Sequence, residues 1–246
     1  MKNFRSLSYH DQLANSTLEW FGSDNELCYQ YNLTNNAKDM VEWLDYKIEY
    51  SFNEYGFRST SFNDVNGVLF LGASNTIGTG LAIEHTWVNI VAAELKSNYY
   101  NLGQGGGSSD TMYRLASYWI KALRPNLVIY LSPPSARLEV IDGLDSEKPF
   151  FRMSSTSITS TSEYTEPSVR KTLGSYYDIW SSCDENILLH EEKNKLAISS
   201  ICNALNTKIV CLSTDSDWIH IDYARDLQHS GIASNKAFAD LVLSYC

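Results

Sequence analysis

Val68-Leu69-Phe70-Leu71-Gly72-Ala73-Ser74-Asn75-Thr76 is an apolar run that ends in small and polar residues. A short apolar run closed by glycine predicts a buried strand of a parallel sheet. The serine then lies just beyond the carboxyl end of that strand, where open α/β sheets bind their ligands. Far downstream, Asp226-Leu227-Gln228-His229 places an acid three residues before a histidine. A serine, a histidine and an acid are the groups of a nucleophilic hydrolase, so the two segments together predict one.

Strand and helix patterns alternate outward from this stretch over residues 67–246. Apolar runs predict strands at 67–73, 99–102, 126–131 and 208–212, and helical spacing predicts helices at 86–96, 109–123 and 232–245. Ser182-Cys183-Asp184-Glu185 matches a capping box, which would open a helix through Leu205 with Leu188 and Leu205 among its inward residues. Strands separated by helices pair in parallel and carry helices on both faces. We therefore predict an α/β fold, a three-layer α/β/α domain with a short parallel sheet.

The flanking segments have a different character. Within residues 1–66, helical spacing predicts a helix over 37–44, with Met40, Val41 and Leu44 on one face, and alternation predicts a strand over 46–53. We expect this region to be an N-terminal extension, or cap, packed on a hydrolase domain at 67–246. Regular patterns fade between Pro133 and about residue 165, and residues 154–162, rich in serine and threonine, are expected to form a loop near the site.

Composition excludes several classes of function. The chain has 246 residues and a formal net charge of −10, which argues against a nucleic-acid surface because such surfaces are basic. No apolar run is long enough to span a bilayer. No apolar segment follows Met1-Lys2-Asn3-Phe4-Arg5, so we expect no Sec signal peptide and a cytoplasmic or otherwise non-Sec-exported protein. The five cysteines form no CxxC pair, which argues against zinc and against a disulfide framework.

The chain resembles the SGNH (GDSL-like) hydrolase superfamily, whose four sequence blocks it matches unevenly. Gly72 to Gly78 keeps the serine, threonine and glycine of the first block, although Ala73 stands where the family has aspartate. The segment from Asn101 to Gly106 matches the second block, Asn-x-x-x-x-Gly. At the place of the third block, which ends in Gly-x-Asn-Asp, the chain has Pro133-Pro134-Ser135-Ala136, so the asparagine is missing. Asp226 to His229 is the fourth block, Asp-x-x-His.

The resemblance implies a role for each matching residue. Ser74 would be the nucleophile, and His229 the base that takes its proton and later protonates the leaving alcohol. Asp226 would orient the imidazole and stabilise its charged form. The backbone N–H groups of Ser74 and Gly106 would form the oxyanion hole. Either the Ser135 hydroxyl or the Arg137 guanidinium could replace the missing third donor.

The implied activity is hydrolysis of an ester with a small acyl group such as acetyl, on a carbohydrate or a similar alcohol, with neither a metal nor an organic cofactor. The alternative is a catalytically weak SGNH-like domain that serves as a binding or structural module, because Ala73 and the lost asparagine both depart from the family. The sequence does not fix an oligomeric state.

Other interpretations of the same residues are weaker. The glycine run at 103–107 could hold a phosphate, but Ser108 stands where the dinucleotide fingerprint needs its third glycine. The acids and histidines between Asp215 and His229 could be read as a metal cluster, but their spacing fits no common zinc motif. The aromatic residues of the N-terminal region are expected to pack rather than to form a sugar-binding platform.

Overall fold

The computed structural model describes residues 3–141, 150–155, 158–160 and 167–246. Its centre is a parallel sheet in the order β4-β3-β5-β9. The strands are β3 (Val68–Leu71), β4 (Tyr99–Asn101), β5 (Leu127–Ser132) and β9 (Lys208–Ser213). All pairings are parallel, as expected for strands that are separated by helices.

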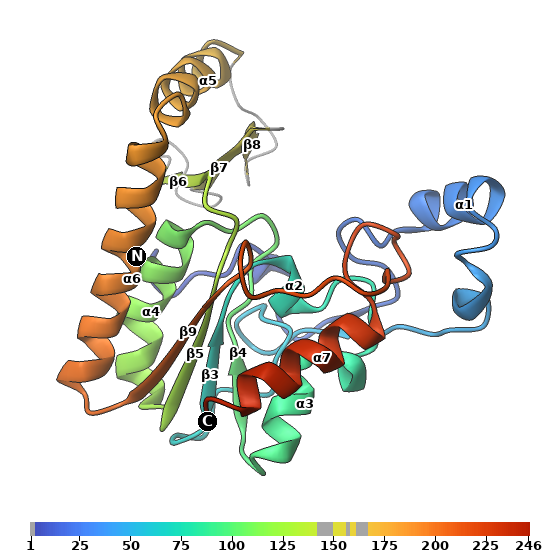
Figure 1. The fold of residues 1–246 in the computed structure, drawn as a ribbon, viewed down its shortest axis with the longest axis horizontal. Coiled ribbons are helices and arrows are strands. Elements are labelled where there is room, and N and C mark those ends of the chain that lie inside the picture. Colours follow the sequence, from blue (N-terminus) through green and yellow to red (C-terminus); the bar gives the residue numbers. More distant parts are fainter. Residues whose placement is uncertain (1–2, 142–149, 156–157, 161–166) are drawn as a thin grey trace.

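Two layers of helices cover the sheet (Figure 1). On one face lie α4 (Ser109–Leu123) and α6 (Asp184–Ala204), and on the other lie α3 (Trp87–Glu94) and α7 (Ile232–Leu243). Successive residues of β3 alternate between these layers, because Leu69 packs with the α4 and α6 side chains while Val68 packs with those of α3 and α7. The predicted three-layer α/β/α domain with a short parallel sheet is confirmed.

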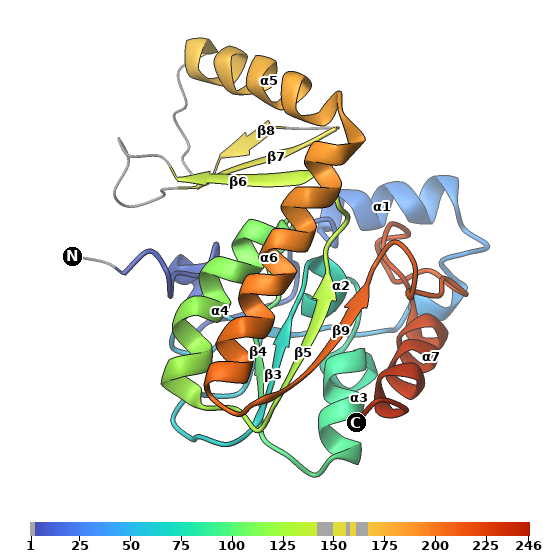
Figure 2. The same cartoon turned by 60° about the vertical axis from the view of Figure 1, so that its left-hand side comes forward.

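The region after β5 was expected to be irregular, and this expectation is wrong. The strands β6 (Arg137–Ile141), β7 (Phe150–Ser154) and β8 (Ile158–Ser160) form a second, antiparallel sheet, which is followed by α5 (Pro167–Ser181). The sheet and α5 stand beyond the main sheet (Figure 2). Of the loop expected at 154–162, residues 156–157 and 161–162 lie outside the described residues, and the rest includes the end of β7 and all of β8.

Helix α6 begins one residue later than the capping-box motif predicts. Its N-cap is Cys183, which makes no side-chain cap, while the Ser182 hydroxyl donates to the Ile179 carbonyl at the end of α5. Leu188 and Leu205, expected on the inner face, are exposed. Ile198 is buried against the sheet, but the first turns of α6 extend past the sheet toward the second one (Figure 2). A helix that covers the sheet along only part of its length buries only that part of its apolar face.

The N-terminal region contains short elements: η1 (Asp11–Leu13), α1 (Glu26–Asn35), η2 (Val41–Trp43) and a two-stranded sheet of β1 (Thr17–Leu18) with β2 (Tyr50–Ser51). The helix expected at 37–44 is only the 3-10 turn η2, and the strand expected at 46–53 is only β2. Met40 and Trp43 are buried, whereas Val41 and Leu44 are exposed.

The N-terminal region packs against the main domain through hydrogen bonds to backbone carbonyls. The Trp119 indole donates to the Ser6 carbonyl at 3.0 Å. Arg58 is buried and donates to the carbonyls of Ile77, Gly78 and Leu81 in the segment after β3. Within the described part of the chain, no helix is both long and apolar enough to cross a bilayer.

Candidate active site

Ser74 lies three residues beyond the carboxyl end of β3, as the first residue of the short helix α2 (Ser74–Ile77). The chain turns at Gly72 before it reaches Ser74, and this turn leaves no room for a side chain. A Cβ on Gly72 would lie 2.0 Å from the Thr76 hydroxyl and 3.2 Å from the Leu131 carbonyl oxygen. No other residue would fit this position without a shift of its neighbours. The Ser74 side chain is half-buried, and its hydroxyl has no hydrogen-bond partner among the described residues.

Asp226 and His229 contact each other in the segment between β9 and α7. The Nδ1 atom of His229 lies 2.6 Å from Oδ2 of Asp226, and the Asp226 side chain is fully buried while that of His229 is 20% exposed. The Asp226 Oδ1 atom accepts the backbone N–H groups of Gln228 and His229. The carboxylate therefore fixes both the ring and the backbone of the histidine. The other ring nitrogen, Nε2, makes no hydrogen bond to the part of the chain that the structure describes.

Asp226 remains ionised because its hydrogen bonds compensate for its burial. Burial alone would raise the pKa of Asp226, but hydrogen bonds from His229 and Ser23, together with the charge of a protonated His229, bring the pKa below its ordinary value. The Ser23 hydroxyl donates to Asp226 Oδ2 at 2.6 Å and lies 3.4 Å from His229 Nδ1. Sequence analysis did not identify Ser23, because it lies 203 residues from Asp226 and belongs to no motif.

The serine segment and the histidine segment lie side by side at one end of the sheet, as Figure 1 shows for α2 and the chain between β9 and α7. The Arg225 backbone N–H donates to the Gly80 carbonyl, and a Cβ on Gly80 would lie 3.3 Å from Asp226 Oδ1. The structure therefore brings the neighbourhood of Ser74 against that of Asp226. It shows no hydrogen bond between Ser74 and His229. Catalytic hydrogen bonds are often long in unliganded enzymes and shorten when substrate binds.

The glycine run after β4 packs against the serine turn. The Gln104 backbone N–H donates to the Gly72 carbonyl at 3.0 Å. Asn101, from the second family block, holds the two segments together: its side chain donates to the Thr76 carbonyl at 2.8 Å and accepts from the Gly103 N–H at 2.9 Å. Among the described residues, the N–H of Gly106 has no hydrogen-bond acceptor. It is available to a ligand beside the serine turn.

The two residues considered as a third oxyanion donor differ in their partners. The Ser135 hydroxyl and backbone N–H both donate to Asp215 Oδ2, at 3.0 and 3.2 Å. Arg137 begins β6, and its Nη1 lies 3.5 Å from the Gly107 carbonyl oxygen, at the end of the glycine run. Both Ser135 donors are directed to Asp215, whereas Arg137 lies at the glycine run and has further N–H donors besides the one that contacts Gly107.

Arg152 is a second cation at the glycine run, and sequence analysis did not identify it. Its Nη1 donates to the Gly105 carbonyl at 2.6 Å, and its guanidinium lies over the ring of Tyr9 at 4.9 Å. Arg152 belongs to β7, in the sheet that the sequence did not predict. Without that sheet, nothing in the sequence places residue 152 beside residues 105 and 106.

The acids and histidines between Asp215 and His229 do not gather at one point. Asp217 accepts the Ser213 N–H, Asp222 accepts the N–H groups at the start of α7, and His220 contacts Ser230. Within the described ranges, no group of three or more such side chains could hold a metal ion.

A second His–Asp pair lies elsewhere, between the helices α4 and α6. His190 Nε2 is 2.8 Å from Asp110 Oδ1, and Asp110 also accepts from Asn194 and from the backbone of Glu139. Asp110, in α4, thus contacts α6 through His190 and Asn194 and contacts β6 through Glu139. The His190–Asp110 pair therefore forms part of the packing of these three elements. It provides a natural control for His229.

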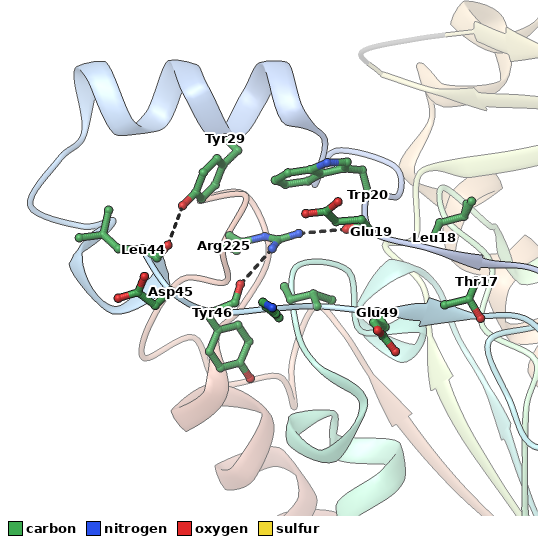
Figure 3. Close-up of a pocket in the computed structure, with 12 residues that line it drawn as sticks. Thr17, Leu18, Glu19, Trp20, Tyr29, Leu44, Asp45, Tyr46, Glu49 and Arg225 are labelled. Atoms are coloured by element: carbon green, nitrogen blue, oxygen red, sulfur yellow. Dashed lines mark hydrogen bonds between the residues drawn. The ribbon is translucent and has the colours of Figure 1, made fainter.

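A separate cavity of about 620 Å³ lies in the N-terminal region (Figure 3). Trp20, Tyr29 and Tyr46 line it, so these three aromatic side chains are less enclosed than sequence analysis expected. Figure 3 shows the Arg225 guanidinium between Trp20 and the backbone of Tyr46, with hydrogen bonds to the carbonyls of Glu19 and Tyr46. Arg225 Nη2 also lies 2.8 Å from Asp24 Oδ2, so its charge is paired within the protein. We therefore assign Arg225 a structural role, in which it links the Glu19 and Tyr46 backbones that line the cavity.

No family profile matches the chain, and no curated protein matches it in sequence. Solved structures do match it. A protein assigned to the G-D-S-L lipolytic family from Desulfitobacterium hafniense DCB-2 is 11% identical over 73% of this chain and 98% of that chain, with a TM-score of 0.36. An acetyl xylan esterase, AlAXEase, is 14% identical over 72% of this chain and 98% of that chain, with a TM-score of 0.35.

An acetyl xylan esterase from the rumen bacterium Butyrivibrio proteoclasticus is 12% identical over 74% of this chain and 63% of that chain, with a TM-score of 0.34. All three structures share only 11–14% identity with this chain and superpose on it with TM-scores of 0.34–0.36. At this degree of similarity, activity and substrate have to be inferred from the residues of this chain.

Proposed function

We propose that this protein is a serine esterase in which Ser74, His229 and Asp226 form the catalytic triad. The single observation that supports this most strongly is the 2.6 Å contact between His229 Nδ1 and a fully buried Asp226 carboxylate, at the sheet end where Ser74 follows β3. A buried carboxylate on Nδ1 sets the tautomer in which Nε2 can accept a proton.

In the proposed reaction, the Ser74 hydroxyl oxygen attacks the ester carbonyl carbon while His229 Nε2 takes its proton. The negative charge that develops on the carbonyl oxygen is met by the backbone N–H groups of Ser74 and Gly106, with Arg137 as the third donor. Collapse of the tetrahedral intermediate breaks the bond to the alcohol, which receives the proton from His229. Water then hydrolyses the acyl-serine by the same steps, and Ser74 is restored.

The proposed substrate is an ester of a small acyl group such as acetyl, on a carbohydrate or a similar alcohol. This part of the proposal rests on the resemblance of the motifs to the SGNH superfamily, since fold alone does not fix a substrate. The alternative is a binding module that has lost catalysis. Ala73 and the absent asparagine of the third block are the observations that favour this alternative.

A fluorophosphonate probe tests the proposal without knowledge of the substrate, because it labels only an activated serine. We expect the wild-type protein to be labelled and Ser74→Ala not to be. Hydrolysis of 4-nitrophenyl acetate should fall by about 10⁴-fold or more in Ser74→Ala and to a similar degree in His229→Ala, since triad residues act as a unit.

Two variants serve as controls. Ser200→Ala removes an exposed serine of α6, and His190→Ala removes the other histidine that is paired with an aspartate. Both should keep most of the wild-type rate. A folded wild-type protein that no probe labels would favour the binding module, and a Ser74→Ala variant that keeps a substantial rate would overturn the choice of nucleophile.

A further inference from the structure

Arg152 lies at the proposed oxyanion hole and, within the part of the chain that the structure describes, has no partner of opposite charge. Its Nη1 donates to the Gly105 carbonyl at 2.6 Å, and a Cβ placed on Gly106 would lie 3.5 Å from the same nitrogen. The guanidinium is therefore next to the backbone N–H that is proposed to meet the reacting carbonyl.

The acid nearest to Arg152 along the sheet is already neutralised. Glu139 is the cross-strand partner of Arg152, but its carboxylate accepts from Arg114 Nε and Nη2 at 2.7 and 3.0 Å and from the Tyr9 hydroxyl. Within the described ranges of the chain, Arg152 forms no ion pair and its only hydrogen bond is the one to Gly105. Its Nε is buried without an acceptor among those residues.

A guanidinium has five N–H donors, so at least three remain available on the Arg152 side chain besides the buried Nε–H. The neighbouring His10 does not add a second positive charge. Burial, and then the positive charge of Arg152, lower the pKa of His10 to about 4, so the ring is neutral at pH 7. A half-buried cation that has no counter-ion among the described residues is costly unless a ligand supplies one.

We propose that Arg152 binds a carboxylate of the substrate, so that the preferred substrate is an ester whose acyl or alcohol part carries a negative charge. The planar fork of a guanidinium matches a carboxylate in a bidentate manner, and a site shielded from water strengthens the contact. This inference rests on the proposed esterase function. The bond to Gly105 would hold the guanidinium in place while its remaining donors face the ligand.

Matched pairs of esters test the inference. 4-Acetoxybenzoate and 4-acetoxybenzamide carry or lack the charge on the alcohol side, and mono-4-nitrophenyl succinate and 4-nitrophenyl butyrate do so on the acyl side. The measured quantity is the ratio of kcat/KM for the charged ester to that for its neutral partner. Comparing this ratio between variants cancels the intrinsic reactivity of each ester.

In Arg152→Gln we expect the ratio to fall by about 10- to 100-fold in one of the two pairs, the range for a hydrogen bond to a charged group. Arg152→Lys should keep part of the preference, because it keeps the charge but loses the bidentate fork. Arg124→Gln is the control, since it removes the same charge from an exposed residue at the other end of β5. In the wild type, added NaCl should lower the ratio.

A ratio that is unchanged in both pairs would overturn the inference. So would an equal loss on charged and neutral esters in both Arg152→Gln and Arg152→Lys, because it would show that Arg152 only supports the glycine run. Failure of the esterase function itself would look different: none of the four esters would be hydrolysed and no probe would label Ser74, and the inference would fall with it.

Discussion

Ser23 joins the N-terminal region to the proposed triad through a single hydroxyl. It donates to the same Asp226 oxygen that His229 contacts, so this oxygen is held from two directions. A carboxylate with fixed hydrogen bonds holds the imidazole in one orientation, which proton transfer requires. Ser23 touches Asp226 rather than the reacting atoms, so we regard it as a positioning residue.

We expect Ser23→Ala to lower kcat roughly tenfold with little change in KM, because a hydrogen bond to a charged group is worth about 1.5–3 kcal/mol and Asp226 keeps its other three. Ser23→Thr should recover most of the rate, since it retains the hydroxyl. Ser200→Ala is the matched control. A Ser23→Ala variant with the wild-type kcat would remove Ser23 from the site.

The pH dependence of stability provides a second measure of Ser23. The pKa of Asp226 is lower in the folded protein than its ordinary value, so its ionisation stabilises the fold above about pH 4. This stabilisation is lost as the pH falls through the folded pKa. Removal of the Ser23 hydrogen bond raises the folded pKa and weakens the effect. In urea titrations, the stability difference between wild type and Ser23→Ala should therefore be largest near pH 7 and shrink toward pH 2.

Sequence analysis could identify Ser74, Asp226 and His229 because each lies in a local motif. The structure places Asp226 and His229 in contact, as the spacing predicted. Ser23 and Arg152 could not be identified in this way, since each reaches the site across the fold from an element without a distinctive pattern. Local spacing carries information about neighbours in the chain and none about contacts between distant segments.

The same distinction holds for the elements. The central strands β3 and β5 are continuous apolar runs because they are covered on both faces, and all four strands of the main sheet were predicted to within a residue or two. The strands β6 and β7 are covered mainly on one side and contain polar residues such as Glu139 and Arg152. Their pattern is weak, and both strands lie in the stretch that was expected to be irregular.

The turn after α2 should be sensitive to added volume, because two proposed site segments meet there. Gly80 has φ +80°, and a Cβ on it would lie 2.7 Å from the Ala224 Cβ and 3.3 Å from Asp226 Oδ1. We expect Gly80→Ala to destabilise the protein by more than about 1 kcal/mol, because the backbone is strained and Ala224 must move. Since Asp226 lies against the same turn, kcat should fall as well.

Gly22→Ala separates these two effects. Gly22 has a similar φ of +65°, but a Cβ there would meet only the Thr79 methyl group, at 3.9 Å. It should therefore cost stability through backbone strain while leaving kcat closer to the wild-type value. Chemical denaturation of both variants gives the loss of stability, and the ester assay gives the change in kcat. Equal effects on kcat would show that crowding against Asp226 plays no part.

Over the whole molecule, a buried ion pair joins residues near the two ends of the chain. Asp24 and Arg225 are 1% and 4% exposed, and Arg225 donates to both carboxylate oxygens, at 2.9 and 2.8 Å. The Tyr50 hydroxyl also donates to Asp24, and it accepts the N–H of Gly80. The N-terminal region is thereby connected to the turn after α2 and to the residue that precedes Asp226.

These contacts lead us to expect that residues 1–66 and 67–246 unfold together rather than as separate units. Asp24→Asn tests this, because it leaves the Arg225 charge buried without a counter-ion. Breaking one partner of a buried pair costs about 3–5 kcal/mol. Unfolding in urea is followed in parallel by tryptophan fluorescence and by probe labelling of Ser74. The free energy of unfolding should fall by this amount, so the midpoint should move to lower urea in one transition common to both signals. Asp240→Asn, which neutralises an exposed acid of α7, should leave the midpoint nearly unchanged.

A different result would separate the two regions. If Asp24→Asn showed an early fluorescence change while Ser74 remained reactive until a later transition, the N-terminal region would be an independent cap whose loss the main domain tolerates. We expect the opposite, because Asp226 and Arg225 are adjacent in the chain and each accepts or donates a hydrogen bond across the boundary. Loss of the N-terminal contacts would remove the Ser23 support of Asp226 in the same step, so reactivity and structure should disappear together.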